Sequence, residues 1–178
     1  MHLRDVRFQA MAPSPAFKPD DLEAFVSAPR IATLAYAKRD GMPTQFPIWY
    51  RYEDGRFHMV TSATSAKAKA LARTGRACLT IKDDMPPYRA VVIDGDVTFS
   101  ETPVEGGLNR WLAVHYFGRL AGAQYEKMAI EEYSKTGLTK ITIDPTRVRG
   151  FDNHQMIPAH LRFYQRMRES LPLLRRFI

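Results

Sequence analysis

The sequence predicts a mainly β protein with added helices, an α+β chain built on about six antiparallel strands. Short runs of alternating apolar and polar residues recur along the chain and are typical of half-buried strands. Turn-forming pairs such as Asp54-Gly55 join the first of these runs at hairpin length, which parallel strands cannot use. Short antiparallel strands with such turns favour a barrel or a sandwich over a doubly wound sheet.

The expected strands cover six stretches, residues 30–37, 43–52, 56–62, 76–82, 88–100 and 138–148. Within the second stretch, Pro47 cannot donate a ladder hydrogen bond, so we expect an edge strand or a bulge there. Gly95 within the fifth stretch indicates a bulge or a close backbone approach. Asp144-Pro145 predicts a kink near the end of the last stretch.

The expected helices lie at residues 19–26, 65–73 and 125–134, with an interrupted helical region between Thr102 and Gly122. In the first helix, Leu22, Phe25 and Val26 share one face. Thr102-Pro103-Val104-Glu105 has the pattern of a capping box and predicts a helix start. From Pro158 onward the pattern is again helical, with apolar residues interleaved with arginines.

The composition indicates a soluble globular protein with a preference for anionic partners. The chain has 178 residues, a net charge of +7 and a pI of about 9.7, which suits a phosphate cofactor, an acidic substrate or simply a solvated basic surface. One cysteine, Cys78, excludes an internal disulfide, and its apolar neighbours predict a place in the core. No apolar leader and no long apolar run is present, so we expect a cytoplasmic protein.

The stretch from Gln45 to Leu71 predicts a phosphate site. Its strand, Asp-Gly turn and returning strand lead into a hydroxyl-rich segment and a basic helix that carries Lys67 and Lys69. A helix start offers free N–H donors and positive dipole charge, which favour a phosphate. Solvent-facing lysines are the plainer interpretation, but the hydroxyls that precede Lys67 favour the phosphate.

The ordered set of these motifs resembles the pyridoxamine 5′-phosphate oxidase-like superfamily of flavin- and deazaflavin-binding split β-barrels. The residues that carry the resemblance are Pro-Ile-Trp-Tyr, the Asp-Gly hairpin, Phe-His-Met-Val-Thr-Ser, the Ser-Ala-Lys-Ala-Lys-Ala-Leu helix and Val-Val-Ile-Asp-Gly-Asp-Val. They cover roughly Ile31 to Glu101 and, more weakly, Thr139 to Gly150. The resemblance implies a six-stranded antiparallel split barrel and a homodimer with its cofactor at the interface. It makes the chain one domain, with a core at residues 18–150 and a helical extension at residues 151–178.

The resemblance also implies a set of cofactor-binding residues. Gln45, Phe46, Pro47, Ile48 and Trp49 would face the ring system. Val60, Thr61 and Ser62 would hold polar atoms of the ring or ribityl chain, and Ser65, Lys67 and Lys69 would bind the phosphate. Arg51 would reach a phosphate or ring carbonyl, and Arg89 would lie where partner strands meet. FMN is the expected cofactor, with F420 as the alternative.

The expected function is an oxidoreductase that transfers hydride to or from a small-molecule substrate. The arginine-rich substrate motif and closing strand of the pyridoxamine oxidases are absent here, so vitamin B6 oxidation is not expected. A non-catalytic cofactor-storage protein is one alternative, and a nucleic-acid or membrane-surface binder using the basic residues 162–176 is another. We favour packing of that tail on the barrel or the dimer mate, and expect neither nucleic acid nor membrane as a partner.

We expect no metal site and no catalytic side chain. His115, His154 and His160 lack metal-ligand spacing with carboxylates. The cofactor carries hydride chemistry itself, while the protein supplies binding, orientation and electrostatics.

Overall fold

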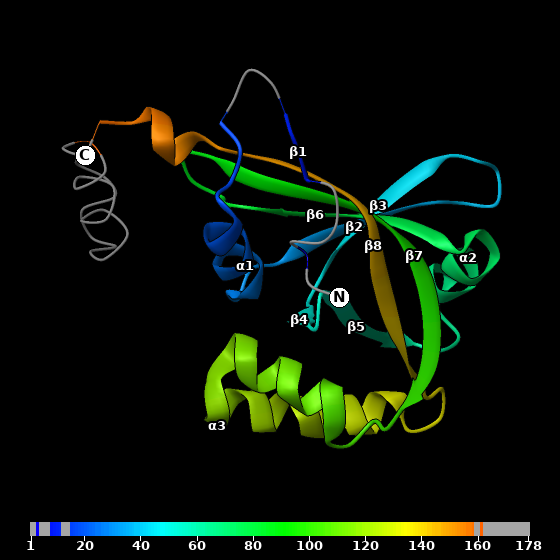
Figure 1. The fold of residues 1–178 in the computed structure, drawn as a ribbon. Helices are drawn as coiled ribbons and strands as arrows, with labels where there is room; N and C mark the ends of the chain where they lie inside the picture. Colours follow the sequence, from blue (N-terminus) through cyan, green and yellow to red (C-terminus); the bar gives the residue numbers. More distant parts are fainter. Residues whose placement is uncertain (1–2, 4–7, 12–14, 159–160, 162–178) are drawn as a thin grey trace.

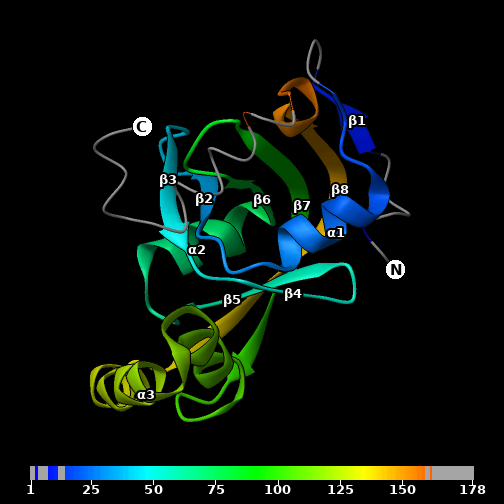
Figure 2. The same cartoon turned by 90° about the vertical axis from the view of Figure 1, so that its left-hand side faces the viewer.

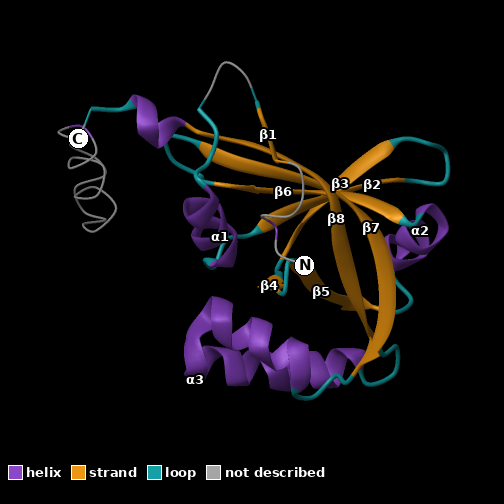
Figure 3. Ribbon diagram, in the orientation of Figure 1, coloured by secondary structure: helices purple, strands orange, loops and turns teal. Residues whose placement is uncertain are grey.

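Within the residues that the structure describes, eight strands form one curved, mainly antiparallel sheet (Figures 1 and 3). The structure is a computed structural model that describes residue 3 and residues 8–11, 15–158 and 161. The strands are β1 (Phe8–Ala10), β2 (Ala32–Ala37), β3 (Pro43–Ile48), β4 (Arg51–Glu53), β5 (Arg56–Ser62), β6 (Arg76–Lys82), β7 (Arg89–Thr102) and β8 (Leu138–Asp152). Their order is β3-β2-β6-β7-β8-β5-β4, with β1 parallel to β8, so the sheet is not closed.

Two features make the strand count larger than the expected six. The short N-terminal strand β1 had no signal in the alternation pattern. The stretch expected as one strand over residues 43–52 is broken at Trp49 and Tyr50, because Tyr50 turns into the core and donates a 2.8 Å hydrogen bond from its hydroxyl to the carbonyl of Val26. Pro47 lies in β3, which is an edge strand as expected.

The core lies on the concave side of the sheet and follows the predicted alternation. Ala77, Leu79 and Ile81 of β6 are buried, whereas Cys78 between them faces the other side and is only half-buried. The expectation that Cys78 packs in the core is therefore wrong. Burial and the neighbouring Asp94 carboxylate raise the pKa of the thiol to about 11.

The long pair β7 and β8 bends at a bulge. The register shifts between Asp94 and Gly95, so that Gly95 lies opposite Pro145 while Asp94 lies opposite Arg147. A Cβ on Gly95 would come within 2.6 Å of the carbonyl oxygen of Asp144, so only glycine fits without movement. The predicted bulge and kink are thus one feature of the ladder.

Three α-helices surround the sheet in the described part of the chain, and a short 3-10 helix follows β8. They are α1 (Pro19–Ser27), α2 (Ala66–Thr74), α3 (Gly107–Tyr133) and η2 (Asn153–Met156). Figures 1 and 2 show α3 below β4 and β5, at one end of the sheet. Among the described helices, none has the length and apolarity that crossing a membrane requires.

The helical region between β7 and β8 differs from the expected one. Thr102 does not cap a helix; it ends β7 and pairs with Leu138, so the strand ladder prevails over the local capping pattern. α3 begins at Gly107 instead and is kinked at Gly118, where φ is 79°. The result is a helical hairpin whose second arm contains the helix expected at residues 125–134.

Candidate functional site

A cavity of about 390 Å³ lies between the ends of β3 and β5, the start of α2 and the hairpin α3. Its size is in the range of small-molecule sites, roughly 300–1,000 Å³. Its lining is Ile31, Pro47, Ile48, Trp49, Val60, Thr61, Ser62, Lys67, Asn109, Leu112, Tyr125, Tyr133 and Leu138. Most of these side chains are apolar or aromatic, and the polar groups among them are those of Thr61, Ser62, Lys67, Asn109 and the two tyrosines.

The α2 side of the cavity carries hydroxyls and one cation. Ser65 caps α2, and its hydroxyl accepts a 3.1 Å hydrogen bond from the Ala68 N–H. Lys67, in the first turn, is half-buried, and this burial lowers the pKa of its ammonium below the ordinary 10.5. Its Nζ lies 5.6 Å from the centre of the Phe46 ring.

Lys67 has no ion-pair partner within the described part of the chain. Nor does any described acceptor receive the N–H groups of Ala66 and Lys67, which start the helix. A partly desolvated cation, free N–H donors and the hydroxyls of Thr61 and Ser62 therefore meet at one wall of the cavity. This set of groups fits an anion such as a phosphate.

The α3 hairpin forms the opposite wall of the cavity. Two sets of contacts hold its two arms together. At Gly122 the two arms cross so closely that a Cβ would lie 2.8 Å from the backbone of Ala113. Glu126 on the second arm is buried and reaches the start of the first. It accepts hydrogen bonds from the Gly106 N–H at 2.6 Å and from Arg110 at 2.8 Å. The hairpin is thereby a fixed wall.

Aromatic contacts join the hairpin to the break between β3 and β4. Trp49 stacks on Tyr116 with ring centres 5.2 Å apart and packs against Tyr125 at 5.0 Å. The Tyr116 hydroxyl donates to the carbonyl of Arg30 at 2.8 Å and accepts from the Tyr50 N–H at 3.2 Å. Trp49 is thus held against the hairpin while it lines the cavity.

The two tyrosines of the second arm remain protonated at neutral pH. Burial raises the pKa of the Tyr125 phenol, and the Glu132 carboxylate raises it further. Burial and Glu132 likewise raise the pKa of Tyr133. The Tyr125 phenol can therefore donate a hydrogen bond into the cavity that it lines.

The structure brings together seven of the predicted cofactor-binding residues. Pro47, Ile48, Trp49, Val60, Thr61, Ser62 and Lys67 all line the cavity. Their contacts with a cofactor stay a prediction, but their position around one cavity agrees with it.

The other six predicted residues lie outside the cavity lining. Gln45, Phe46 and Lys69 are exposed, and Ser65 is engaged as the helix cap. Arg51 pairs with Glu53 and lies 4.8 Å from the centre of the Trp111 ring. Arg89 forms an ion pair with Asp83 away from the cavity. None of these six residues belongs to the cavity lining.

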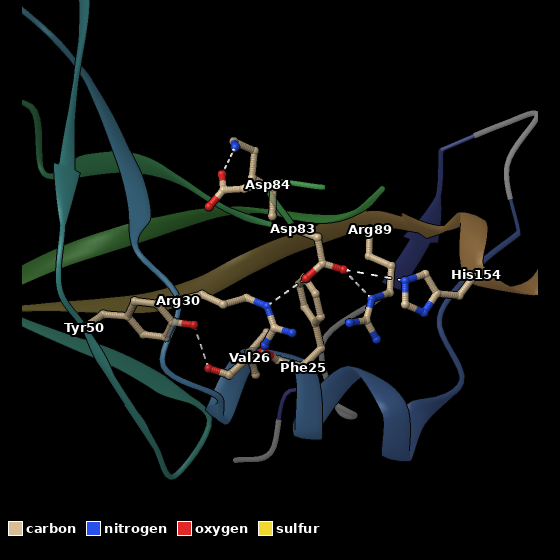
Figure 4. A network of polar contacts seen from close by, with 9 residues as sticks. Phe25, Val26, Arg30, Tyr50, Asp83, Asp84, Arg89 and His154 are labelled. Carbon is tan, nitrogen blue, oxygen red and sulfur yellow. Dashed lines mark hydrogen bonds and ion pairs between the residues drawn. The ribbon is translucent and has the colours of Figure 1, made fainter. Parts of the chain in front are cut away.

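Asp83 is the centre of a polar network (Figure 4). Its carboxylate pairs with Arg30 at 3.1 Å and with Arg89 at 2.6 Å, and His154 approaches to 4.0 Å. Both guanidinium groups lie over the Phe25 ring of α1, at 4.1 Å and 4.8 Å. The network holds the loop after β6 against helix α1. Arg89 thereby has a structural role in the fold.

Sequence patterns missed the lining residues that come from outside the β2–α2 segment. They are Ile31, Asn109, Leu112, Tyr125, Tyr133 and Leu138. Tyr125 and Tyr133 are eight residues apart, which places them on one face of a helix and was a usable signal. Asn109 and Leu138 had no local signal, because contacts distant in the sequence place them here: Leu138 pairs with Ser62 and Thr102, and Asn109 lies in the first turn of α3.

Metal ligands do not gather in the described residues, where no group of three or more His, Cys, Asp or Glu side chains has a suitable arrangement. The cavity lining itself contains no histidine, cysteine or methionine among the described residues.

Comparison with known proteins places this architecture. Among curated proteins no sequence matched the chain. The solved structure of conserved hypothetical protein Rv2991 from Mycobacterium tuberculosis is 25% identical, with a TM-score of 0.65, and covers 84% of this chain and 94% of its own.

Two further structures share the fold. An F420 reductase is 20% identical with a TM-score of 0.59, and the match covers 71% of this chain and 94% of that one. The haem storage protein HutZ from Vibrio cholerae is 11% identical with a TM-score of 0.51, over 71% and 88% of the two chains. Residues 19–151 match the sequence profile described as pyridoxamine 5′-phosphate oxidase. Since that match spans most of the chain, the protein belongs to the pyridoxamine 5′-phosphate oxidase family.

Proposed function

We propose that this protein is an oxidoreductase that binds a flavin-type cofactor, FMN or alternatively F420, and acts on a small-molecule substrate. The observation that carries the proposal is Lys67, a half-buried cation without a described carboxylate partner, at the wall of a cavity that combines apolar side chains with polar groups. Membership of the family and the likeness to an F420 reductase support the choice of cofactor class.

The lining residues fit such a cofactor at both of its ends. Lys67, the first N–H groups of α2 and the hydroxyls of Thr61 and Ser62 would hold its phosphate. The apolar side chains of Pro47, Ile48 and Trp49 would contact its ring system. When bound, a flavin or deazaflavin supplies hydride transfer at the ring.

The chain's own contribution is position and exclusion of water. The contact with Tyr116 fixes Trp49, and the α3 hairpin covers the apolar side chains of the cavity. Tyr125 offers a neutral hydrogen-bond donor. No carboxylate or imidazole is among the described lining residues, so the proposal assigns no catalytic acid or base.

We further propose that the protein acts as a homodimer. Ile31 is 56% exposed although it lines the cavity, and Phe46 beside Lys67 is 49% exposed. Apolar side chains that flank a binding cavity and face solvent are suited to cover by a second copy. Light scattering after size-exclusion chromatography tests this, and a monomer at micromolar concentration contradicts it.

Absorbance spectroscopy of the purified protein, followed by fluorescence titration with FMN and with F420, tests the cofactor. Lys67→Ala should weaken binding of the preferred cofactor by about tenfold or more, because it removes a charge-assisted contact worth roughly 1.5–3 kcal/mol. Lys69→Ala is the matched control, since Lys69 lies two residues further along the same helix, is exposed and does not line the cavity.

Equal loss in the two variants would point to general surface charge and contradict the assigned site. If neither cofactor binds at micromolar concentration, the proposed function is wrong. A yellow protein that binds its cofactor but is not reduced by any hydride donor would instead support a storage role. The basic residues 162–176, the alternative binder of nucleic acid or membrane, lie outside the residues that the structure describes.

A further inference from the structure

Asn109 is a buried polar side chain at the cavity. It lies in the first turn of α3, is only 7% exposed and belongs to the cavity lining. Sequence patterns gave it no role, and neither the hairpin contacts nor the aromatic contacts explain it.

The orientation of its side-chain amide is fixed by a backbone carbonyl. Asn109 Nδ2 donates a 2.9 Å hydrogen bond to the carbonyl oxygen of Val104. A carbonyl can only accept, so the nitrogen must face Val104 and the Oδ1 oxygen must face away from it. No donor among the described residues reaches that Oδ1.

The other buried polar side chains are used differently. Both carboxylate oxygens of Glu126 accept hydrogen bonds within the hairpin. Asp152 Oδ1 accepts from the His154 N–H. Asn109 is the one of these three buried polar residues that lines the cavity, and its Oδ1 has no described donor.

The remaining polar groups of the cavity can all donate. Lys67 is an ammonium, Tyr125 and Tyr133 are neutral phenols, and Thr61 and Ser62 carry hydroxyls. Asn109 Oδ1 is therefore the one side-chain oxygen of the described lining that can only accept. A ligand that matches this lining carries an anion for Lys67 and an O–H or N–H donor for Asn109.

We propose that Asn109 is a specificity-determining residue, whose side-chain oxygen accepts a hydrogen bond from an O–H or N–H group of the bound molecule. The inference rests on the proposed function and names the donor that the cavity selects. A flavin carries such donors on its ribityl chain and its ring as well as a phosphate. Metal-loaded haem with ionised propionates offers no such donor, so Asn109 favours the flavin class over haem.

The experiment compares riboflavin with FMN, because the two share the ring N–H and the inner ribityl hydroxyls and differ at the end of the chain, which is a hydroxyl in riboflavin and a phosphate in FMN. Binding is measured by fluorescence titration on the full chain. Asn109→Ala should weaken riboflavin and FMN by the same factor, about tenfold, for the loss of one hydrogen bond. Lys67→Ala should weaken FMN and leave riboflavin nearly unchanged. Gln124→Ala, on an exposed position of the same hairpin, should change neither.

Asn109→Asp separates the acceptor from the bond to Val104. This variant loses the donor to Val104, as alanine does, but keeps an acceptor facing the cavity. Neutral riboflavin should therefore bind it within about threefold of the unmodified protein.

Equal loss of riboflavin binding in the alanine and aspartate variants would overturn the proposal, since the lost Val104 bond would explain both. Unchanged binding in Asn109→Ala would overturn it as well, while loss of FMN in Lys67→Ala would leave the proposed function standing. If the unmodified protein binds none of riboflavin, FMN and F420, the proposed function and this inference fail together. Thermal unfolding of each unliganded variant shows whether α3 stays folded.

Discussion

The Asp83 network and the cavity wall that carries Lys67 differ in whether their positive side chains have an internal carboxylate partner. Arg30 and Arg89 are mostly buried, at 21% and 22% exposure of their side chains, and share one carboxylate that is itself 17% exposed (Figure 4). Lys67 is also partly buried, yet no carboxylate among the described residues forms an ion pair with it. Charges that are paired internally stabilise the fold, whereas a desolvated charge without an internal partner is suited to an external one.

The largest effect should come from breaking the Asp83 network. Asp83→Ala leaves two mostly buried guanidinium groups without their shared carboxylate and should lower the free energy of unfolding by about 3 kcal/mol. Urea unfolding followed by circular dichroism measures it. Asp84→Ala is the neighbouring control. Asp84 is 87% exposed and among the described residues pairs with one exposed lysine, so its loss should cost less than about 0.5 kcal/mol. Equal effects in the two variants would remove the distinction between the two regions.

The pH dependence of FMN binding should sharpen the assignment of Lys67. Burial lowers the pKa of the free ammonium below 10.5, and a bound phosphate favours the charged form and raises the pKa again. Affinity should therefore be highest below the lowered pKa and fall as pH rises through it, by up to about tenfold per pH unit. Titrations from about pH 7 to 10 measure this. Lys67→Met should abolish the fall, and a fall of the same size in that variant would assign it to another group.

The smallest effect should be on the stability of the unliganded protein. Lys67→Met removes a partly desolvated cation that has no described ion-pair partner, so the free energy of unfolding should change by less than about 0.5 kcal/mol. The same denaturant experiment measures it without cofactor. A loss comparable to that of Asp83→Ala would make Lys67 a structural residue and contradict its assignment to a ligand.

Local signals predicted the parts of the fold that local chemistry decides. Asp54 and Gly55 both have positive φ, at 50° and 78°, as the predicted tight hairpin requires. Gly75 ends α2 in the left-handed conformation. The segment from Pro47 to Lys67 likewise supplied half of the cavity, because its strand, turn and helix are adjacent in the chain.

Long-range contacts decided what the sequence patterns missed. The strand over residues 43–52 breaks because Tyr50 is drawn into the core and held by Val26 and Tyr116. Thr102 has the sequence pattern of a helix cap, but it pairs with Leu138 in the strand ladder instead. Asn109 reaches the cavity because α3 starts directly beside it, which no local pattern predicts. None of these competitions is visible in a short window of sequence.

The pairing of Thr102 with Leu138 has a consequence for how this site can vary. The ladder between β7 and β8 is complete at that pair, so residues 103–137 are an insertion between two strands that already meet. The wall that carries Lys67 belongs to the sheet and to α2, while the facing wall belongs to this insertion. A short turn could replace the insertion without a change of strand register. Exchanging residues 103–137 could thus alter which molecule is recognised, while Lys67 and the start of α2 stay in place.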